Sequence, residues 1–327
     1  MINETTHSIT HYCEAEAIRE FSMLQFVRKI LKVHGENSEP KRLSGGWTNF
    51  VYAAGDLVLR FTANLESGRL SRETQLAKLL PEEAGYPELV DSGRTDGYDW
   101  MLCKRIHGIN LEDTWPELSR KERANALEQI WKRVKYVHTV ATEKVGGYVN
   151  NSLWYMTTLE NAVAEAELLL ERKLLSEEQC EMLKMYIRYF ETAMENAQLV
   201  PVHGDLTPAN VMWKQGKITA LMDFECATIA PKEADLMMLL NTAFERMDLR
   251  DAVTDVEAEQ EFNNRMHELV QKEAPDWDIL QGYRVIKLVH HVVMDMDDDD
   301  FTVEHEELVC LLDLLKDGKG RLAPVMK

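Results

Sequence analysis

The feature that most constrains this chain is the run HGDLTPAN at His203–Asn210, which a proline interrupts and which reads as a loop. Two strand-like runs follow it, Val211–Trp213 and Ile218–Met222, and a short turn separates them. A β-hairpin of this kind would bring two carboxylates and one carboxamide to the same edge, namely those of Asp205, Asp223 and Asn210.

The chemistry of these three side chains points to a metal and a base. Hard oxygen ligands suit Mg²⁺, which binds one or two carboxylates together with substrate phosphates. The pattern therefore predicts Asn210 and Asp223 as metal ligands, and it leaves Asp205 to accept the proton of an attacking hydroxyl group. These are the parts that phosphoryl transfer requires. An isolated Asp and Asn at this spacing would more often belong to a turn, so the prediction depends on the whole arrangement.

The run HGDLTPAN, the hairpin and Asp223-Phe224-Glu225 together resemble the catalytic loop and metal-binding loop of the aminoglycoside phosphotransferase and choline kinase family. That family shares the protein-kinase fold, and the resemblance covers most of residues 42–240. It implies an α+β, bilobal protein-kinase-like fold, with a small β-rich, nucleotide-binding N-lobe over residues 1–106 and a larger, mainly helical C-lobe over residues 107–327. It also implies an enzyme that uses ATP and Mg²⁺ to phosphorylate a hydroxyl group of a small molecule.

Three positions near the central run refine this resemblance. Two of them depart from the family pattern: Thr207 stands where many relatives have His, and Glu225 stands where they have glycine. The DFE form is similar to that of choline-kinase-like members, a resemblance that leaves open whether Glu225 contacts a metal or the acceptor. By the same resemblance Asp235 caps the next helix and braces the catalytic loop. The link Cys226–Ala234 is too short for the activation segment of a protein kinase, which disfavours that alternative. A catalytically inactive nucleotide-binding regulatory protein is a further alternative, against which the intact site residues argue.

The N-terminal part carries candidate phosphate-binding residues. The glycines of Ser44-Gly45-Gly46 would let backbone amides approach phosphate oxygens, although a plain hairpin turn explains the same residues. Arg60 lies inside the apolar strand-like run Leu57–Phe61 and needs a partner there, which Glu73 on the following helix can supply. Such a pair holds ATP phosphates in phosphoryl-transfer enzymes. The family usually has Lys at the position of Arg60, and Arg is not its equivalent.

Strand-like runs in the first hundred residues predict a five-stranded sheet; they lie within Arg42–Thr62 and at Pro87–Leu89 and Asp99–Lys104. A helix is expected before them over residues 14–31, with an apolar face that includes Phe21. By the family resemblance the Lys104 carbonyl and the Ile106 amide contact adenine, although an ordinary edge strand would look the same.

From Leu111 onward the pattern becomes helical, with capping boxes that start at Ser119 and Ser176. Trp154 and Tyr155 fall between helices and belong either to the core or to a platform for the substrate. The acidic run Asp295–Asp300 reads either as a solvated loop or as a binding surface for a cationic acceptor.

Composition limits the partners and the compartment. A net charge of −19 disfavours nucleic acid and anionic membranes as partners. It is compatible with a cationic substrate such as an aminoglycoside or an amino alcohol, although acidity also serves solubility. Five dispersed cysteines, no signal pattern and no long apolar run predict a cytoplasmic protein with reduced thiols. The sequence leaves the oligomeric state open.

Overall fold

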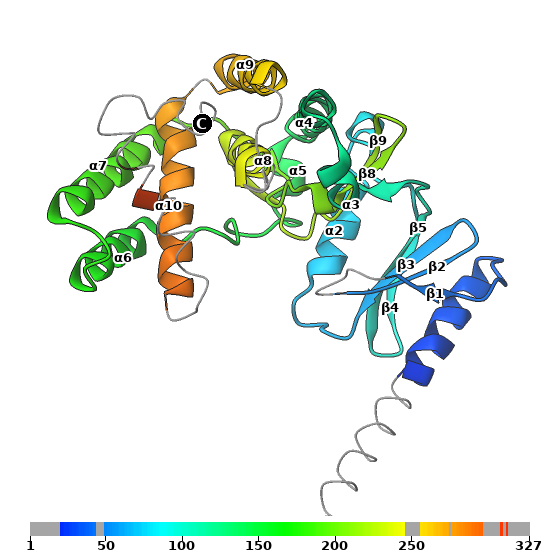
Figure 1. Cartoon of the computed structure of the whole chain (residues 1–327). Helices are drawn as coiled ribbons and strands as arrows, with labels where there is room; N and C mark the ends of the chain where they lie inside the picture. The colour runs from blue at the N-terminus through cyan, green and yellow to red at the C-terminus, as the bar shows by residue number, and fades with distance from the viewer. Residues whose placement is uncertain are drawn as a thin grey trace, which may run out of the picture. The chain divides into compact units, whose positions relative to one another are not determined.

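The computed structural model describes residues 20–43, 49–245, 256–274 and 276–296, together with Leu308, Val309 and Leu312. Contacts divide the chain into two compact units. The N-terminal unit comprises Met1–Lys78 and Pro87–Ile106, and the C-terminal unit comprises Leu79–Tyr86 and His107–Lys327. The first is rich in strands and the second is mainly helical (Figure 1).

The N-terminal unit is built on one antiparallel sheet. Its strands are β1 (Lys41–Arg42), β2 (Phe50–Ala54), β3 (Leu57–Thr62), β4 (Leu89–Thr95) and β5 (Tyr98–Lys104). They follow the order β1-β2-β3-β5-β4, which confirms the predicted five strands. The predicted run Pro87–Leu89 overlaps the fourth strand only at Leu89, since that strand continues to Thr95 and proline has no N–H to donate to a strand ladder. Helix α2 (Arg69–Ala77) also belongs to this unit.

A helix over residues 20–33 packs its apolar face into the core of the same unit. The buried residues recur every three or four positions, at Met23, Phe26, Val27, Ile30 and Leu31. Phe26 meets Phe61 of β3 with ring centroids 5.1 Å apart. The prediction that Phe21 belongs to this face is wrong, since its side chain is 62% exposed. Helical rotation places Phe21 on the side opposite the buried stripe.

Helices make up most of the C-terminal unit. In chain order they are α3 (Leu111–Thr114), α4 (Arg120–Val137), α5 (Thr142–Val145), α6 (Leu159–Glu171), α7 (Glu177–Met194), α8 (Glu233–Glu245), α9 (Val256–Glu273) and α10 (Trp277–Asp295). Both predicted capping boxes are present, because Ser119 pairs with Glu122 and Ser176 pairs with Gln179. Helices α6, α7 and α10 pack against one another, and α9 packs against α4 (Figure 1).

Two small sheets complete the C-terminal unit. One contains β6 (Ile109–Asn110), β8 (Val211–Lys214) and β9 (Lys217–Leu221), and the other pairs β7 (Leu199–Val202) with β10 (Thr228–Pro231). Short 3₁₀ turns lie at η1 (Glu82–Ala84), η2 (Trp115–Glu117) and η3 (Pro208–Asn210). The predicted hairpin is therefore confirmed as β8–β9, and its turn residues Gln215 and Gly216 both have positive φ.

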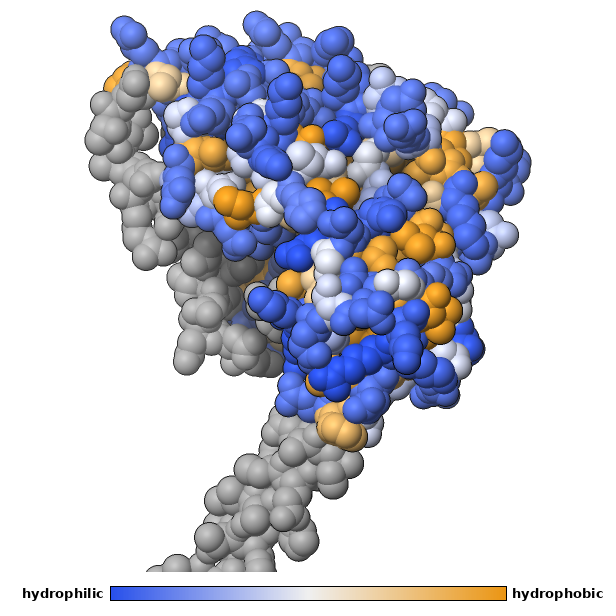
Figure 2. Space-filling view, turned by 90° about the vertical axis from the view of Figure 1, so that its right-hand side faces the viewer, coloured by the Kyte–Doolittle hydropathy of each residue, from blue (hydrophilic) through white to orange (hydrophobic). Residues whose placement is uncertain are grey.

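The structure also settles several choices that the sequence left open. Tyr155 is a core residue with 1% of its surface exposed, whereas Trp154 is 55% exposed. Most of the acidic run, Asp297–Asp300, lies outside the described residues. Among the residues that are described, no helix combines the length and the hydrophobicity that a membrane crossing needs. The face drawn in Figure 2 is mostly hydrophilic, with hydrophobic residues in smaller patches.

Candidate active site

The loop between β7 and β8 closes on itself around Asp205. Asn210 Nδ2 donates to the backbone oxygen of Asp205 at 2.8 Å and to its carboxylate Oδ2 at 3.0 Å. The backbone N–H of Thr207 also donates to the Asp205 carbonyl, at 2.9 Å. Pro208 starts the 3₁₀ turn that carries the chain back toward β8. The structure thus brings Asp205 and Asn210 into direct contact.

The hairpin edge joins this loop to the segment that holds Asp223. The backbone N–H of Met222 donates to the Asn210 carbonyl at 2.8 Å, and His203 Nε2 lies 2.9 Å from the Met222 carbonyl, to which it must donate. Asp223 follows directly and has a φ of 63°, a left-handed conformation that costs a non-glycine residue energy. Asn210 and Asp223 therefore meet at one edge of the hairpin.

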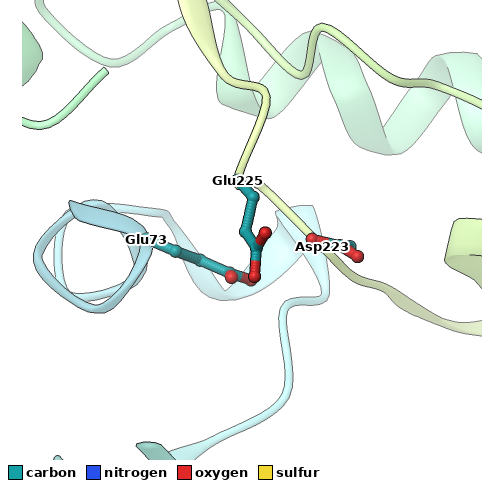
Figure 3. A group of neighbouring side chains, drawn as sticks. All are labelled: Glu73, Asp223 and Glu225. Atoms are coloured by element: carbon teal, nitrogen blue, oxygen red, sulfur yellow. The ribbon is translucent and has the colours of Figure 1, made fainter. Parts of the chain in front are cut away.

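The segment Asp223-Phe224-Glu225 is held by its central ring. Phe224 is 2% exposed and packs between His203, at 4.4 Å between ring centroids, and Tyr86, at 5.7 Å. The flanking acids project from the same segment after β9 (Figure 3), and one carboxylate oxygen of Asp223 lies within 4.8 Å of one of Glu225. Two acids this close repel each other unless a cation or a proton separates them.

The buried carboxylate of Asp235 holds the backbone at the start of the loop that contains Asp205. Its carboxylate accepts the backbone N–H of His203 at 2.9 Å and that of Gly204 at 3.1 Å, and His138 Nε2 lies 2.9 Å away. Asp235 has no exposed surface. The expectation that it caps the next helix is wrong, because α8 already begins at Glu233 and the Asp235 carboxylate is committed to the loop.

In the N-terminal unit, the structure pairs Arg60 of β3 with Glu73 of α2. Arg60 Nη1 donates to Glu73 Oε1 at 2.9 Å, and the Glu73 side chain is fully buried while that of Arg60 is 16% exposed. Burial, with the nearby charge of Glu73, raises the pKa of the Cys103 thiol to about 12, which Arg60 opposes. The pair therefore sits in a strongly desolvated environment.

Two of the remaining predicted nucleotide contacts, Lys104 and Ile106, lie at the end of this sheet. Lys104 is the last residue of β5 and pairs with Leu57, and Ile106 closes the unit. The backbone N–H of Arg105 between them donates to the Asp56 carbonyl at 2.8 Å. Ser44, Gly45 and Gly46 lie outside the described residues.

Sequence reasoning missed one residue that clamps the segment after Asp223. Asn150 Nδ2 donates to the Glu225 carbonyl at 2.7 Å, and its backbone N–H donates to the Ala227 carbonyl at 2.7 Å. Thr228 Oγ1 donates to the Asn150 carbonyl at 2.6 Å. No local pattern could have revealed this contact, because Asn150 lies 75 positions before Glu225.

Residues 39–281 match the phosphotransferase enzyme family, APH, which is more than half of the chain. The chain belongs to this family. The predicted resemblance to aminoglycoside phosphotransferases is thereby confirmed. Within the family, the chain is 26% identical over 161 residues to the aminoglycoside 3'-phosphotransferase of Streptomyces fradiae, a match that covers 46% of this chain and only 56% of that relative.

Solved structures of aminoglycoside phosphotransferases share the fold. The GDP complex of aminoglycoside 2'-phosphotransferase-IIIa aligns with a TM-score of 0.61 at 19% identity, covering 90% of this chain and 99% of the other. The streptomycin–ATP–APH(2")-IIa ternary complex aligns with a TM-score of 0.55 at 18% identity, covering 88% and 95%. At these identities the likeness concerns the fold, and it confirms the predicted kinase-like α+β architecture.

Proposed function

We propose that this phosphotransferase moves the terminal phosphoryl group of ATP to a hydroxyl group of a small molecule, with Mg²⁺ as the cofactor. The observation that carries the proposal is the arrangement around one hairpin. The Asn210 side chain donates to the Asp205 carboxylate, and the Asn210 carbonyl accepts the backbone N–H of Met222, the residue before Asp223. Kinases that transfer a phosphoryl group place a catalytic Asp, a metal-binding Asn and a second metal-binding Asp at their active site.

Asp205 is proposed as the residue that orients the acceptor hydroxyl and accepts its proton. The hydrogen bond from Asn210 Nδ2 to Asp205 Oδ2, at 3.0 Å, holds the carboxylate in one orientation. Asp235 also helps to orient Asp205, because it holds the backbone N–H groups of the two preceding residues, His203 and Gly204. A base that is already oriented loses less conformational freedom when the acceptor binds.

The side chains of Asn210 and Asp223 fit a magnesium ion. The Asn210 side chain uses Nδ2 for both of its hydrogen bonds to Asp205, so Oδ1 is the atom that it can offer to a cation. Asp223 adds a carboxylate, and the nearby Glu225 carboxylate makes the segment still more negative. When bound, Mg²⁺ neutralises charge on the transferred phosphate.

The nucleotide is proposed to bind residues of the N-lobe, residues 1–106, while the C-lobe, residues 107–327, supplies the catalytic loop and the acceptor site. Arg60, held by Glu73, would contact phosphates, and the turn Ser44-Gly45-Gly46 would cover them. The Lys104 carbonyl and the Ile106 amide would contact adenine. Solved relatives with this fold hold GDP in one case and ATP in another, which supports nucleotide binding.

The acceptor is proposed to be a cationic amino sugar or amino alcohol, and the enzyme to work in the cytoplasm. The net charge of −19 favours a cation over an anion as substrate. The relative from Streptomyces fradiae is an aminoglycoside 3'-phosphotransferase, and one solved relative holds streptomycin. Neither nucleic acid nor membrane is expected as a partner.

An acceptor screen with ATP labelled at the terminal phosphate tests the proposal. The panel contains aminoglycosides, choline and other amino alcohols, neutral sugars, anionic metabolites and a generic protein substrate. We expect label on a small hydroxyl compound, and Asp205→Ala should lower kcat at least about 100-fold while nucleotide binding survives. Nucleotide binding without turnover on any acceptor would instead support the inactive regulatory protein, and label on the protein substrate would support a protein kinase.

A further inference from the structure

A side chain outside the predicted site joins two elements that lie 99 positions apart in the chain. Asn110 ends β6, and its Oδ1 accepts the backbone N–H of Glu112 at 2.8 Å, which caps helix α3. Its Nδ2 donates to the carbonyl oxygen of Ala209 at 2.6 Å. One amide therefore uses its acceptor on the helix and its donor on the loop of the candidate active site.

The bond to Ala209 acts directly on the peptide that leads into Asn210. Fixing the Ala209 carbonyl fixes the plane of that peptide, and the N–H of the same peptide donates to the Thr207 carbonyl at 3.0 Å. The side chain of Asn210 in turn holds Asp205. A rotation of this one peptide would therefore displace both Asn210 and Asp205.

The position of Asn110 is itself well determined. Strand β6 pairs with β8, with Asn110 opposite Met212, so the amide is anchored beside the hairpin. Asp and Ser cap helices about as well as Asn does, but an ionised Asp has no donor and Ser has too short a side chain to span both bonds. A helix cap alone would thus not require Asn at this position.

We propose that Asn110 is a positioning residue of the phosphotransferase site, whose side-chain N–H holds the Ala209–Asn210 peptide and thereby the arrangement of Asn210 and Asp205. The effect on turnover rests on the proposed function, whereas the effect on the loop does not. The two bonds of Asn110 can be separated by substitution: Asn110→Ser and Asn110→Asp keep the cap and lose the bond to the Ala209 carbonyl, and Asn110→Ala loses both.

Amide hydrogen exchange of the full chain measures the loop independently of activity. In the Ser and Asp variants, we expect exchange in the peptide spanning Asn210–Met212 to rise about 3- to 10-fold, the effect of one net hydrogen bond. The amide of Glu112 should stay protected in both variants and lose protection only in Asn110→Ala. Unchanged exchange at Asn210–Met212 in both cap-retaining variants overturns the proposal.

Kinetics of the same variants test the consequence for the site. We expect kcat to fall about 3- to 10-fold and the Mg²⁺ concentration for half-maximal rate to rise, while the acceptor KM stays the same. Faster loop exchange with unchanged kcat and unchanged Mg²⁺ requirement also overturns the proposal. If the wild-type chain shows no phosphoryl transfer, the proposed function fails, and the exchange data alone decide whether Asn110 clamps the loop.

Discussion

The α-carbon of Gly204 lies directly against the carbonyl oxygen of Cys226. A Cβ added at Gly204 would stand 2.2 Å from that oxygen, and the φ of Gly204 is +78°, which favours glycine. Two loops of the candidate active site, the one before Asp205 and the one after Asp223, therefore touch through backbone atoms. Only a residue without a side chain allows this approach.

Gly204→Ala should disturb both loops. Left-handed backbone costs a non-glycine residue about 1–2 kcal/mol, and the clash with the Cys226 carbonyl adds to it. We expect a lower melting temperature and a loss of kcat larger than about tenfold. Gly97→Ala is the matched control, because Gly97 has a φ of +79° with nothing within 4 Å of the added Cβ. Equal effects of the two substitutions would contradict the role of the close approach.

The pair of Arg60 and Glu73 should contribute both to the stability of the fold and to nucleotide affinity, and substitutions should separate the two effects. Arg60→Met leaves the buried Glu73 carboxylate without this partner and should lower the unfolding free energy by about 3–5 kcal/mol. The double variant Arg60→Met/Glu73→Met should recover most of that stability but not the nucleotide affinity, while Arg60→Lys should keep measurable affinity. Denaturant unfolding and nucleotide titration give the two readouts. Nucleotide affinity restored in the double variant would remove Arg60 from phosphate binding.

The stability of the contact between α9 and α4 should depend on pH, because an ion pair between Glu273 and Lys135 joins these helices. Burial by itself raises the pKa of Glu273, but the hydrogen bond from Lys135, at 2.8 Å, and other contacts outweigh burial and hold that pKa below its usual value. A lowered carboxylate pKa contributes stability above the unfolded value, about 4.5, and this contribution is lost as the pH falls through the folded value.

Lys135→Met should therefore lower the melting temperature at neutral pH, and the gap to the wild type should close as the pH falls through the folded pKa of Glu273. Lys132→Met makes the same charge change at an exposed position of the same helix and should show little gap at neutral pH or in acid. A gap for Lys135→Met that persists undiminished in acid would mean that packing of the lysine stem, and not the charge pair, stabilises this interface.

The charge of the acceptor should appear in the salt dependence of turnover. For a cationic acceptor, kcat/KM should fall as ionic strength rises, because salt shortens the Debye length to about 8 Å at 0.15 M. Replacing Asp297–Asp300 with Asn should raise the acceptor KM with little change in kcat. A neutral sugar acceptor serves as the reference without salt dependence. A neutral or anionic compound as the best substrate would refute the predicted charge.

Local patterns in the sequence were sufficient for much of the fold. The strand–turn–strand run at Val211–Leu221, the capping boxes at Ser119 and Ser176 and the helical spacing of Val27, Ile30 and Leu31 depend on neighbours within a few positions. The same holds for the loop between Asp205 and Asn210, whose closing contacts span five residues. Such features follow from backbone geometry and side-chain spacing, which a single stretch already contains.

Only the tertiary structure decided which distant residues support that loop. Asn110 reaches Ala209 across 99 positions, Asn150 reaches Glu225 across 75, and His138 reaches Asp235 across 97. Each of these side chains is ordinary in its own stretch of sequence. Its role arises because the packing of helices and small sheets brings its polar group to a backbone or carboxylate partner. Where that partner is buried, leaving it without a hydrogen bond would be costly.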